Sequence, residues 1–542
     1  MSVSPTGPAM MAAGPAPPGI DEAGLRARVT EVLDRWPSAG LAAGVIYGGS
    51  MTWFVGHGVA DAGSKAPVTP DTVFRVGSLT KTFTAIAIMQ LWEQGLVDLD
   101  APARDYLRAF QLIPARASYR PVTVRHLLTH TAGIGYWRRL SDLLQPGVGA
   151  SDRAGRSGAP PLADYYRRGL PVEVEPGTKW VYSNHGFAAL GQIVEDVTGQ
   201  PLDRYLRDHI FVPLGMAGSD LLRSERVKAR LATGYVLRPH GLKPVADREV
   251  PTPASGGMYS TGRDMARYLA ALLRMGAGEH GPVLRPATLA AMFQPHFRPD
   301  PRVPGMGLAF EPREEGGHMT VGKTGVVSGF LSAMVLAPDD GIGVYALSNT
   351  GGLSGRGAAA PLATALLRHA LGLPGETVRS DIPARPDVWG ELCGWYGPDP
   401  GPVTNLTIRA LFGAGAEVTV HRGQLTLKPL TPVPAMRRGM RLHPDDPGDP
   451  RVFRAELPEF GLNVPVVFSG APGDGGAATR LVLDLMSFRR RPGARNPRRW
   501  VNGAAAAGAV ALAIHCGRRQ ARSGRNEGAG IRSAQAEWCS RA

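Results

Sequence analysis

The stretch FLSAMVLAPDDGIGVYALSN, residues 330–349, holds two short apolar runs on either side of residues 339–341 (DDG). Asp and Gly between apolar runs favour a tight turn, so the stretch predicts a β-hairpin. A helical pattern follows over residues 356–371. Far upstream, residues 41–60 predict a second hairpin, and residues 21–36 before it carry apolar side chains at the spacing of one helix face.

A helix and a hairpin therefore open this region, and a hairpin and a helix close it. The simplest assembly is one antiparallel sheet built from both ends of the region, with the terminal helices on one face. The long middle then forms a mostly helical insert on the other side. The pattern predicts an α+β fold in which helices cover both faces of the sheet.

The rest of the chain changes character after this region. A Pro-rich stretch precedes segments of alternating hydrophobicity (AEVTVHRGQLTLKPL, VPVVFSG, TRLVLDLMSF), which predict a small all-β domain. Barrel and sandwich both remain open. We expect a disordered leader (1–20), the α+β domain (21–372), a linker (373–386), the β domain (387–488) and a basic, loose tail (489–542).

The net charge of +14 is concentrated in the tail. Residues 489–542 hold twelve Arg and two Glu, a net charge of +10, so the other 488 residues carry only +4. No nucleic-acid-binding signature accompanies the tail, and we expect no nucleic-acid partner. Residues 504–514 fall short of the ~18–20 residues of a membrane span. They predict a surface helix, with a truncated anchor as the alternative, and a weak contact of the Arg-rich tail with anionic membranes is a further hypothesis.

The start of the chain has no charged segment followed by a sustained apolar run, so no signal peptide is predicted and we expect a cytoplasmic protein. The three cysteines (Cys393, Cys516 and Cys539) form no CxxC pair. Neither a zinc site nor a disulfide framework is therefore indicated. The sequence defines no oligomeric state.

The first candidate for chemistry is FRVGSLTK, residues 74–81, followed by an apolar helical segment. Ser78 lies at the N-terminus of this predicted helix, and Lys81 three residues later shares its face. A serine hydroxyl needs a base within hydrogen-bond reach, and a desolvated lysine can be that base. Among the seven lysines only Lys81 has a serine three residues before it. An N-capping serine beside a solvated lysine is the alternative for this motif alone.

Two further motifs follow in order. Tyr182 and Asn184 belong to WVYSN, where a tyrosine can carry protons and an amide can bind a substrate carbonyl. Lys323, Thr324 and Gly325 lie just before the hairpin predicted at residues 330–349, where a cation can orient a carboxylate. A core tyrosine and a simple turn are the respective alternatives.

His126 and His130 lie four residues apart, which is a spacing found in metal sites. No third ligand is evident nearby, so we expect both histidines to be structural and no metal to be bound.

The three motifs together resemble those of the serine β-lactamase and DD-peptidase superfamily. The Tyr–x–Asn form is similar to the class C branch, which also includes esterases and D-aminopeptidases. HLLTHTAGI (126–134), PGTKWVYSN (176–184), PLGM (213–216) and ASGGMYSTGRDMARYL (254–269) also look like stretches of that family. The resemblance covers roughly residues 21–371 and implies the β-lactamase/transpeptidase-like fold.

The resemblance implies a serine hydrolase that forms an acyl-enzyme through Ser78, with Lys81 and Tyr182 as proton carriers. It leaves open which of these two is the base in acylation. Asn184 would hold the acyl side chain, and the backbone N–H groups of Ser78 and Val326 would form the oxyanion hole. No cofactor is implied.

The resemblance assigns the third motif to substrate binding. Lys323 and Thr324 would contact a substrate carboxylate or support Tyr182, and Gly325 would let the backbone approach a ligand. The implied substrate is a small ester, peptide or lactam. The competing hypothesis is a penicillin-binding-type or ligand-binding module that no longer turns over.

Overall fold

The structure is a computed structural model that describes residues 21–136, 161–352, 355–375, 378–399, 401–431, 433–457, 462–470 and 476–498. The predicted leader (1–20) and the predicted Ala-rich helix (504–514) lie outside these residues. Among the described residues, no helix has both the length and the apolar character that crossing a bilayer requires.

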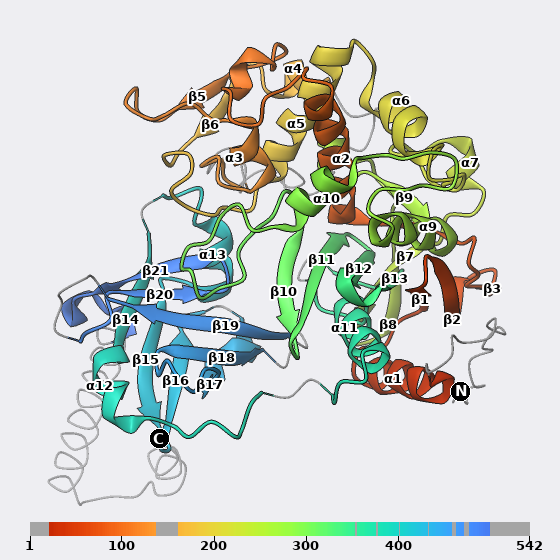
Figure 1. The fold of residues 1–542 in the computed structure, drawn as a ribbon. Coiled ribbons are helices and arrows are strands. Elements are labelled where there is room, and N and C mark those ends of the chain that lie inside the picture. Colours follow the sequence, from red (N-terminus) through yellow and green to blue (C-terminus); the bar gives the residue numbers. More distant parts are fainter. Residues whose placement is uncertain are drawn as a thin grey trace, which may run out of the picture.

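A seven-stranded antiparallel sheet forms the centre of the larger part of the molecule (Figure 1). Its strands in spatial order are β10 (Glu311–Glu315), β11 (His318–Val327), β12 (Phe330–Ala337), β13 (Ile342–Ser348), β1 (Gly40–Tyr47), β2 (Ser50–Asp61) and β3 (Ala66–Pro67). Both predicted hairpins are confirmed as β1–β2 and β12–β13. They meet where β1 pairs with β13, so the two ends of the region do build one sheet.

Helices cover both faces of this sheet, as the sequence predicts. On one face lie α1 (Glu22–Arg35) and α11 (Ala359–Ala370), whose apolar residues pack on β1, β12 and β13. On the other face, α2 (Thr80–Glu93) and α9 (Gly262–Leu273) share a larger core with the sheet. Both faces of β1 are therefore buried, which explains why its seven residues from Gly40 to Ile46 are all buried.

The segment between the hairpins is the predicted helical insert. Its other helices are α3 (Val124–Leu128), α4 (Leu162–Tyr165), α5 (Asn184–Thr198), α6 (Leu202–Leu206), α7 (Glu225–Lys228), α8 (Pro253–Gly256) and α10 (Pro286–Phe293). Its short strands are β4 (Val73–Arg75), β5 (Leu112–Pro114), β6 (Leu170–Val172), β7 (Gly234–Arg238), β8 (Gly241–Val245) and β9 (Tyr259–Thr261).

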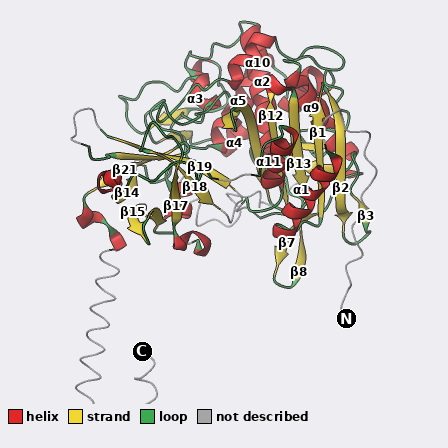
Figure 2. Ribbon diagram, turned by 60° about the horizontal axis from the view of Figure 1, so that its bottom comes forward, coloured by secondary structure: helices red, strands yellow, loops and turns green. Residues whose placement is uncertain are grey.

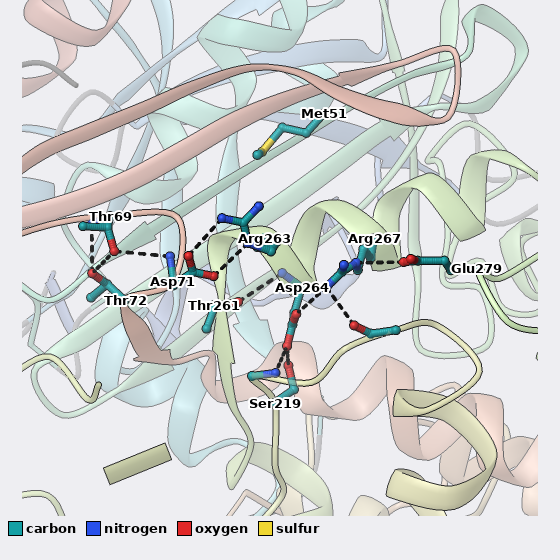
Figure 3. A network of polar contacts seen from close by, with 12 residues as sticks. Met51, Thr69, Asp71, Thr72, Ser219, Thr261, Arg263, Asp264, Arg267 and Glu279 are labelled. Atoms are coloured by element: carbon teal, nitrogen blue, oxygen red, sulfur yellow. Dashed lines mark hydrogen bonds and ion pairs between the residues drawn. The ribbon is translucent and has the colours of Figure 1, made fainter. Parts of the chain in front are cut away.

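A polar network joins α9, the insert helix that packs on the sheet, to other segments of the insert (Figure 3). Thr261 caps the helix by accepting the backbone N–H of Asp264. The buried Asp264 carboxylate in turn accepts hydrogen bonds from the Ser219 hydroxyl and from a neighbouring backbone N–H. Arg263, the residue before Asp264, forms a two-bond ion pair with Asp71. These contacts tie residues 71 and 218–219 of the insert to α9, the helix that packs against β1, β2 and β13.

The all-β part forms a closed barrel, which settles the choice between barrel and sandwich. It consists of β14 (Gly394–Pro398), β15 (Ala416–His421), β16 (Gln424–Pro429), β17 (Met440–Pro444), β18 (Val452–Leu457), β19 (Leu462–Ser469), β20 (Arg480–Leu483) and β21 (Met486–Arg491), with α12 (Trp389–Leu392) and α13 (Leu406–Phe412) beside it. Pairing of β14 with β21 closes the barrel. Figure 2 shows the barrel to one side of the sheet and its helices.

The last strand of the barrel extends into the basic segment. Arg489, Arg490 and Arg491 belong to β21 and pair with β14. The loose tail predicted to begin at residue 489 is therefore wrong for these three residues, because their backbone hydrogen bonds complete the barrel wall. Residues 499–542 of the predicted tail lie outside the described part of the chain.

Candidate active site

Ser78 lies in a single 3-10 turn, Gly77–Leu79, that leads directly into α2. Gly77 has a φ of +51°, a backbone conformation that favours glycine. Lys81 follows on the first turn of α2 and is fully buried. Its Nζ lies 3.1 Å from Ser78 Oγ, so the predicted i, i+3 contact is present.

The Lys81 amine is held by two further acceptors. Nζ donates to Asn184 Oδ1 at 2.8 Å and to the backbone carbonyl of Ser255 at 2.6 Å. Burial lowers the pKa of Lys81 well below its usual value, and the positive charge of Lys323 lowers it further. A buried amine with a lowered pKa is neutral over a wider pH range and can accept a proton from Ser78.

Tyr182 approaches Ser78 from the other side. Its hydroxyl lies 2.6 Å from Ser78 Oγ, and Lys81 Nζ and Lys323 Nζ lie 4.9 and 5.2 Å from the centre of its ring. Burial raises the pKa of Tyr182, and Lys323 offsets part of that rise. The resting phenol is therefore protonated and donates to Ser78, and the Lys323 cation lies close enough to stabilise the phenolate that forms if Tyr182 loses its proton.

The two histidines have structural contacts. His126 Nδ1 accepts the backbone N–H of Thr123 and completes the capping box of α3. His130 is buried, its Nδ1 accepts the backbone N–H of Ser183, and its ring packs 4.5 Å from the Tyr182 ring. Among the residues with described positions, no three His, Cys, Asp or Glu side chains come together as a metal site.

The third motif lies on β11, directly beside the Ser78 turn. Lys323 is buried, and its Nζ lies 2.6 Å from Glu311 Oε1 on the neighbouring strand β10. Burial lowers the pKa of Lys323, but Glu311 outweighs this effect and raises it. Thr324, next along the strand, is exposed. Lys323 Nζ already forms an ion pair with Glu311 and lies near the Tyr182 ring. Its contacts therefore favour the role of supporting Tyr182 over the role of binding a substrate carboxylate.

Gly325 allows β11 to pass against the nucleophile turn. A Cβ at Gly325 would lie 2.1 Å from the carbonyl oxygen of Val76 and 3.0 Å from the backbone nitrogen of Ser78. A Cβ at Gly77 would lie 2.8 Å from the backbone nitrogen of Val326. The backbone nitrogens of Ser78 and Val326 therefore belong to two segments in direct contact, as an oxyanion hole requires.

Replacing Gly325 by alanine is expected to push β11 away from the Ser78 turn, because neither clashing backbone atom is a flexible group. We expect Gly325→Ala to lower kcat/KM for a chromogenic ester by about 10²–10³-fold, the scale of losing one oxyanion-hole donor. Steady-state kinetics and a circular-dichroism spectrum of the same sample check this. A folded variant with unchanged kcat/KM would contradict it.

Three residues contribute to the site but could not be identified from the sequence. Glu311 neutralises Lys323, the Ser255 carbonyl holds Lys81, and Tyr136 stacks on Tyr182 with ring centres 6.3 Å apart. Ser255 lies in α8, beside glycines that by themselves indicate only a turn. Glu311 carries no signal in the sequence, because only the register of β10 against β11 brings it to Lys323.

Comparison with known proteins agrees with this geometry. Residues 25–369 match the family described as Beta-lactamase, so the chain belongs to the Beta-lactamase family. Esterase EstB of Burkholderia gladioli is 34% identical over 254 residues, which are 44% of this chain and 62% of the esterase, less than two thirds of its length. Penicillin-binding protein 4 of Amycolatopsis lactamdurans is 30% identical over 310 residues, which are 55% of this chain and 77% of that protein.

A solved structure extends the likeness in fold. The octameric penicillin-binding protein homologue from Pyrococcus abyssi aligns with a TM-score of 0.58 and 24% identity. The alignment covers 86% of this chain and 100% of that chain. The β-lactamase/transpeptidase-like fold expected from the motifs is thereby confirmed.

Proposed function

We propose that this protein is a serine hydrolase that cleaves an ester, amide or lactam bond through an acyl-enzyme on Ser78. The observation that carries the proposal is the double contact at Ser78 Oγ, with Lys81 Nζ at 3.1 Å and the Tyr182 hydroxyl at 2.6 Å. A nucleophile flanked by a neutral amine and a phenol has one group to take its proton and another to deliver a proton.

In the proposed acylation, Ser78 Oγ forms a bond to the substrate carbonyl carbon while its proton passes to the neutral Lys81 amine. The directions of the two pKa shifts favour Lys81 over Tyr182 as this base, since that of Lys81 is lowered and that of Tyr182 is raised. The N–H groups of Ser78 and Val326 hold the oxyanion. Tyr182 then protonates the leaving group as its bond breaks, and Lys81 returns the proton to Tyr182.

Hydrolysis of the acyl-enzyme completes the proposed cycle. A water molecule attacks the acyl carbon, its proton passes to the Lys81–Tyr182 pair, and Ser78 leaves and recovers a proton from that pair. Asn184 orients Lys81 in the resting site, because its Oδ1 accepts from Nζ. We propose that its amide N–H serves the role expected from the sequence and holds the acyl group.

A direct test incubates the protein with a chromogenic short-chain ester and, separately, with a chromogenic cephalosporin. The proposal expects continuous release from at least one substrate at a rate well above that of Ser78→Ala. Release that stops after one equivalent would support the binding module instead. No release above the Ser78→Ala background from either substrate would contradict the proposed hydrolase.

A further inference from the structure

The barrel contacts the catalytic domain along its β10 side, where Figure 1 shows one end of β19 close to the lower end of that strand. Among the described residues, polar contacts cross this boundary at three places, and each place holds a different segment of the catalytic domain. One holds the segment that leads to Tyr182, one holds β10, and one holds the loop after α10. The first two contacts hold segments that carry residues around Ser78.

The first contact lies just before the catalytic tyrosine. Lys179 is buried, and its Nζ donates to Asn405 Oδ1 at 2.5 Å, where Asn405 lies fully buried at the start of α13. Burial lowers the pKa of Lys179 to about 8. Nearby, the Glu173 carboxylate accepts the backbone N–H groups of Val403 and Thr404 at 2.9 and 2.6 Å. Residues 173–179 are thus fixed to the barrel within three residues of Tyr182.

The second contact holds the strand that carries Glu311. Arg313 forms two hydrogen bonds to Asp484, at 2.5 and 2.9 Å, in the turn between β20 and β21. Arg313 and Glu311 are two residues apart on β10, so their side chains leave the same face of the strand. Glu311 holds Lys323, whose Nζ lies against the Tyr182 ring. These side chains form a row of alternating charges, called here the charge row, that runs from the barrel to Tyr182. Its members are Asp484, Arg313, Glu311 and Lys323.

The third contact has the same chemistry but reaches no site residue. Arg302 donates to Asp449 at 2.8 Å and to the carbonyl of Phe468 at 3.0 Å. Arg302 lies in the loop after α10 and pairs with Asp300 in that loop. This contact joins the two parts of the molecule without holding a segment that bears Tyr182 or Glu311, so it provides a matched control.

We propose that the barrel is part of the catalytic apparatus: Lys179 and Asp484 are positioning residues that hold Tyr182 and the Glu311–Lys323 pair against Ser78. The proposal rests on the proposed function, because it concerns the residues that activate that serine. A barrel that merely stabilised the chain would have no need to fix these two segments in particular.

The test uses the full-length protein and measures the rate at which a fluorophosphonate labels Ser78, followed by intact mass. This readout needs no knowledge of the substrate. Lys179→Met removes one contact and leaves the barrel's own hydrogen bonds in place, and Asp484→Asn removes the charge of the other. Asp449→Asn is the control, because it makes the same change at the contact that holds no site segment. The urea midpoint of each variant is measured alongside.

We expect Lys179→Met and Asp484→Asn each to slow labelling about tenfold or more, the scale on which misplacement of a catalytic group acts. Asp449→Asn should lower the urea midpoint comparably and leave the labelling rate within twofold. Two results would overturn the proposal: unchanged labelling in both test variants, or equal slowing in all three in step with the loss of stability. Failure of the wild type itself to be labelled at Ser78 would instead overturn the proposed function and, with it, this inference.

The pH profile of labelling separates positioning from general destabilisation. Lys81 is faced by Lys323 on β11, Glu311 on β10, and Tyr182 and His130 in the insert. Asp484→Asn removes one negative charge from the charge row, and the resulting rise in its net positive charge lowers the pKa of Lys81. We therefore expect the acid limb of the pH profile, where the labelling rate falls as pH is lowered, to move to lower pH in Asp484→Asn. In Asp449→Asn it should stay at the wild-type pH. An identical shift in both variants would count against the charge row.

Discussion

Ser78→Ala is expected to lower kcat for a chromogenic ester by about 10³–10⁶-fold, the range seen when a nucleophile is removed from a serine hydrolase. The physical reason is that Lys81 and Tyr182 both direct their polar atoms at Ser78 Oγ, the atom that this substitution removes. Steady-state kinetics at saturating substrate measures the loss.

Ser50→Ala is the control for this substitution, because Ser50 is an exposed residue at the start of β2. Its kcat should equal that of the wild type. A Ser78→Ala protein that folds and retains a tenth or more of the wild-type kcat would show that another group is the nucleophile.

Lys81→Met is expected to lower kcat by a similar factor, about 10³–10⁶-fold, because removal of the base from such a pair costs about as much as removal of the nucleophile. Methionine keeps the length and the apolar stem of the side chain in a fully buried position, so packing is largely preserved. Lys243→Met, which replaces an exposed lysine on β8, should leave kcat unchanged. Loss of less than tenfold in Lys81→Met would move the role of base to Tyr182.

The pH dependence of the wild type follows from the same amine. Only neutral Lys81 can take the proton of Ser78, so kcat/KM should rise with pH as Lys81 loses its proton. Burial lowers the pKa of Lys81 well below the usual lysine value, and the rise should therefore lie well below pH 10. A rate that follows hydroxide concentration without a plateau would contradict a lysine base.

The sequence predicts those parts of the fold that depend on short-range patterns. Both hairpins and both terminal helices are confirmed because their turns and apolar faces are encoded within about twenty residues. The sequence could not distinguish a barrel from a sandwich, because the barrel depends on the pairing of β14 with β21. These two strands begin more than ninety residues apart. No local pattern determines whether two such distant edges meet.

The same distinction holds for the site. Ser78 and Lys81 could be paired from their spacing on one helix, whereas Tyr182 and Lys323 could be placed only by resemblance to a family. Glu311 and Lys179 could not be found, because a charged residue at a strand end or in a loop is ordinary until its partner is known. Their partners come from another strand and from the barrel.

The proposed mechanism requires that Ser78 becomes acylated during turnover. The most direct measurement is rapid acid quenching of the protein during hydrolysis of a chromogenic ester, followed by intact mass and peptide mapping. We expect one added acyl group on the peptide that contains Ser78, and none in Ser78→Ala. Turnover that leaves Ser78 unmodified while the acyl group appears on another residue would contradict it.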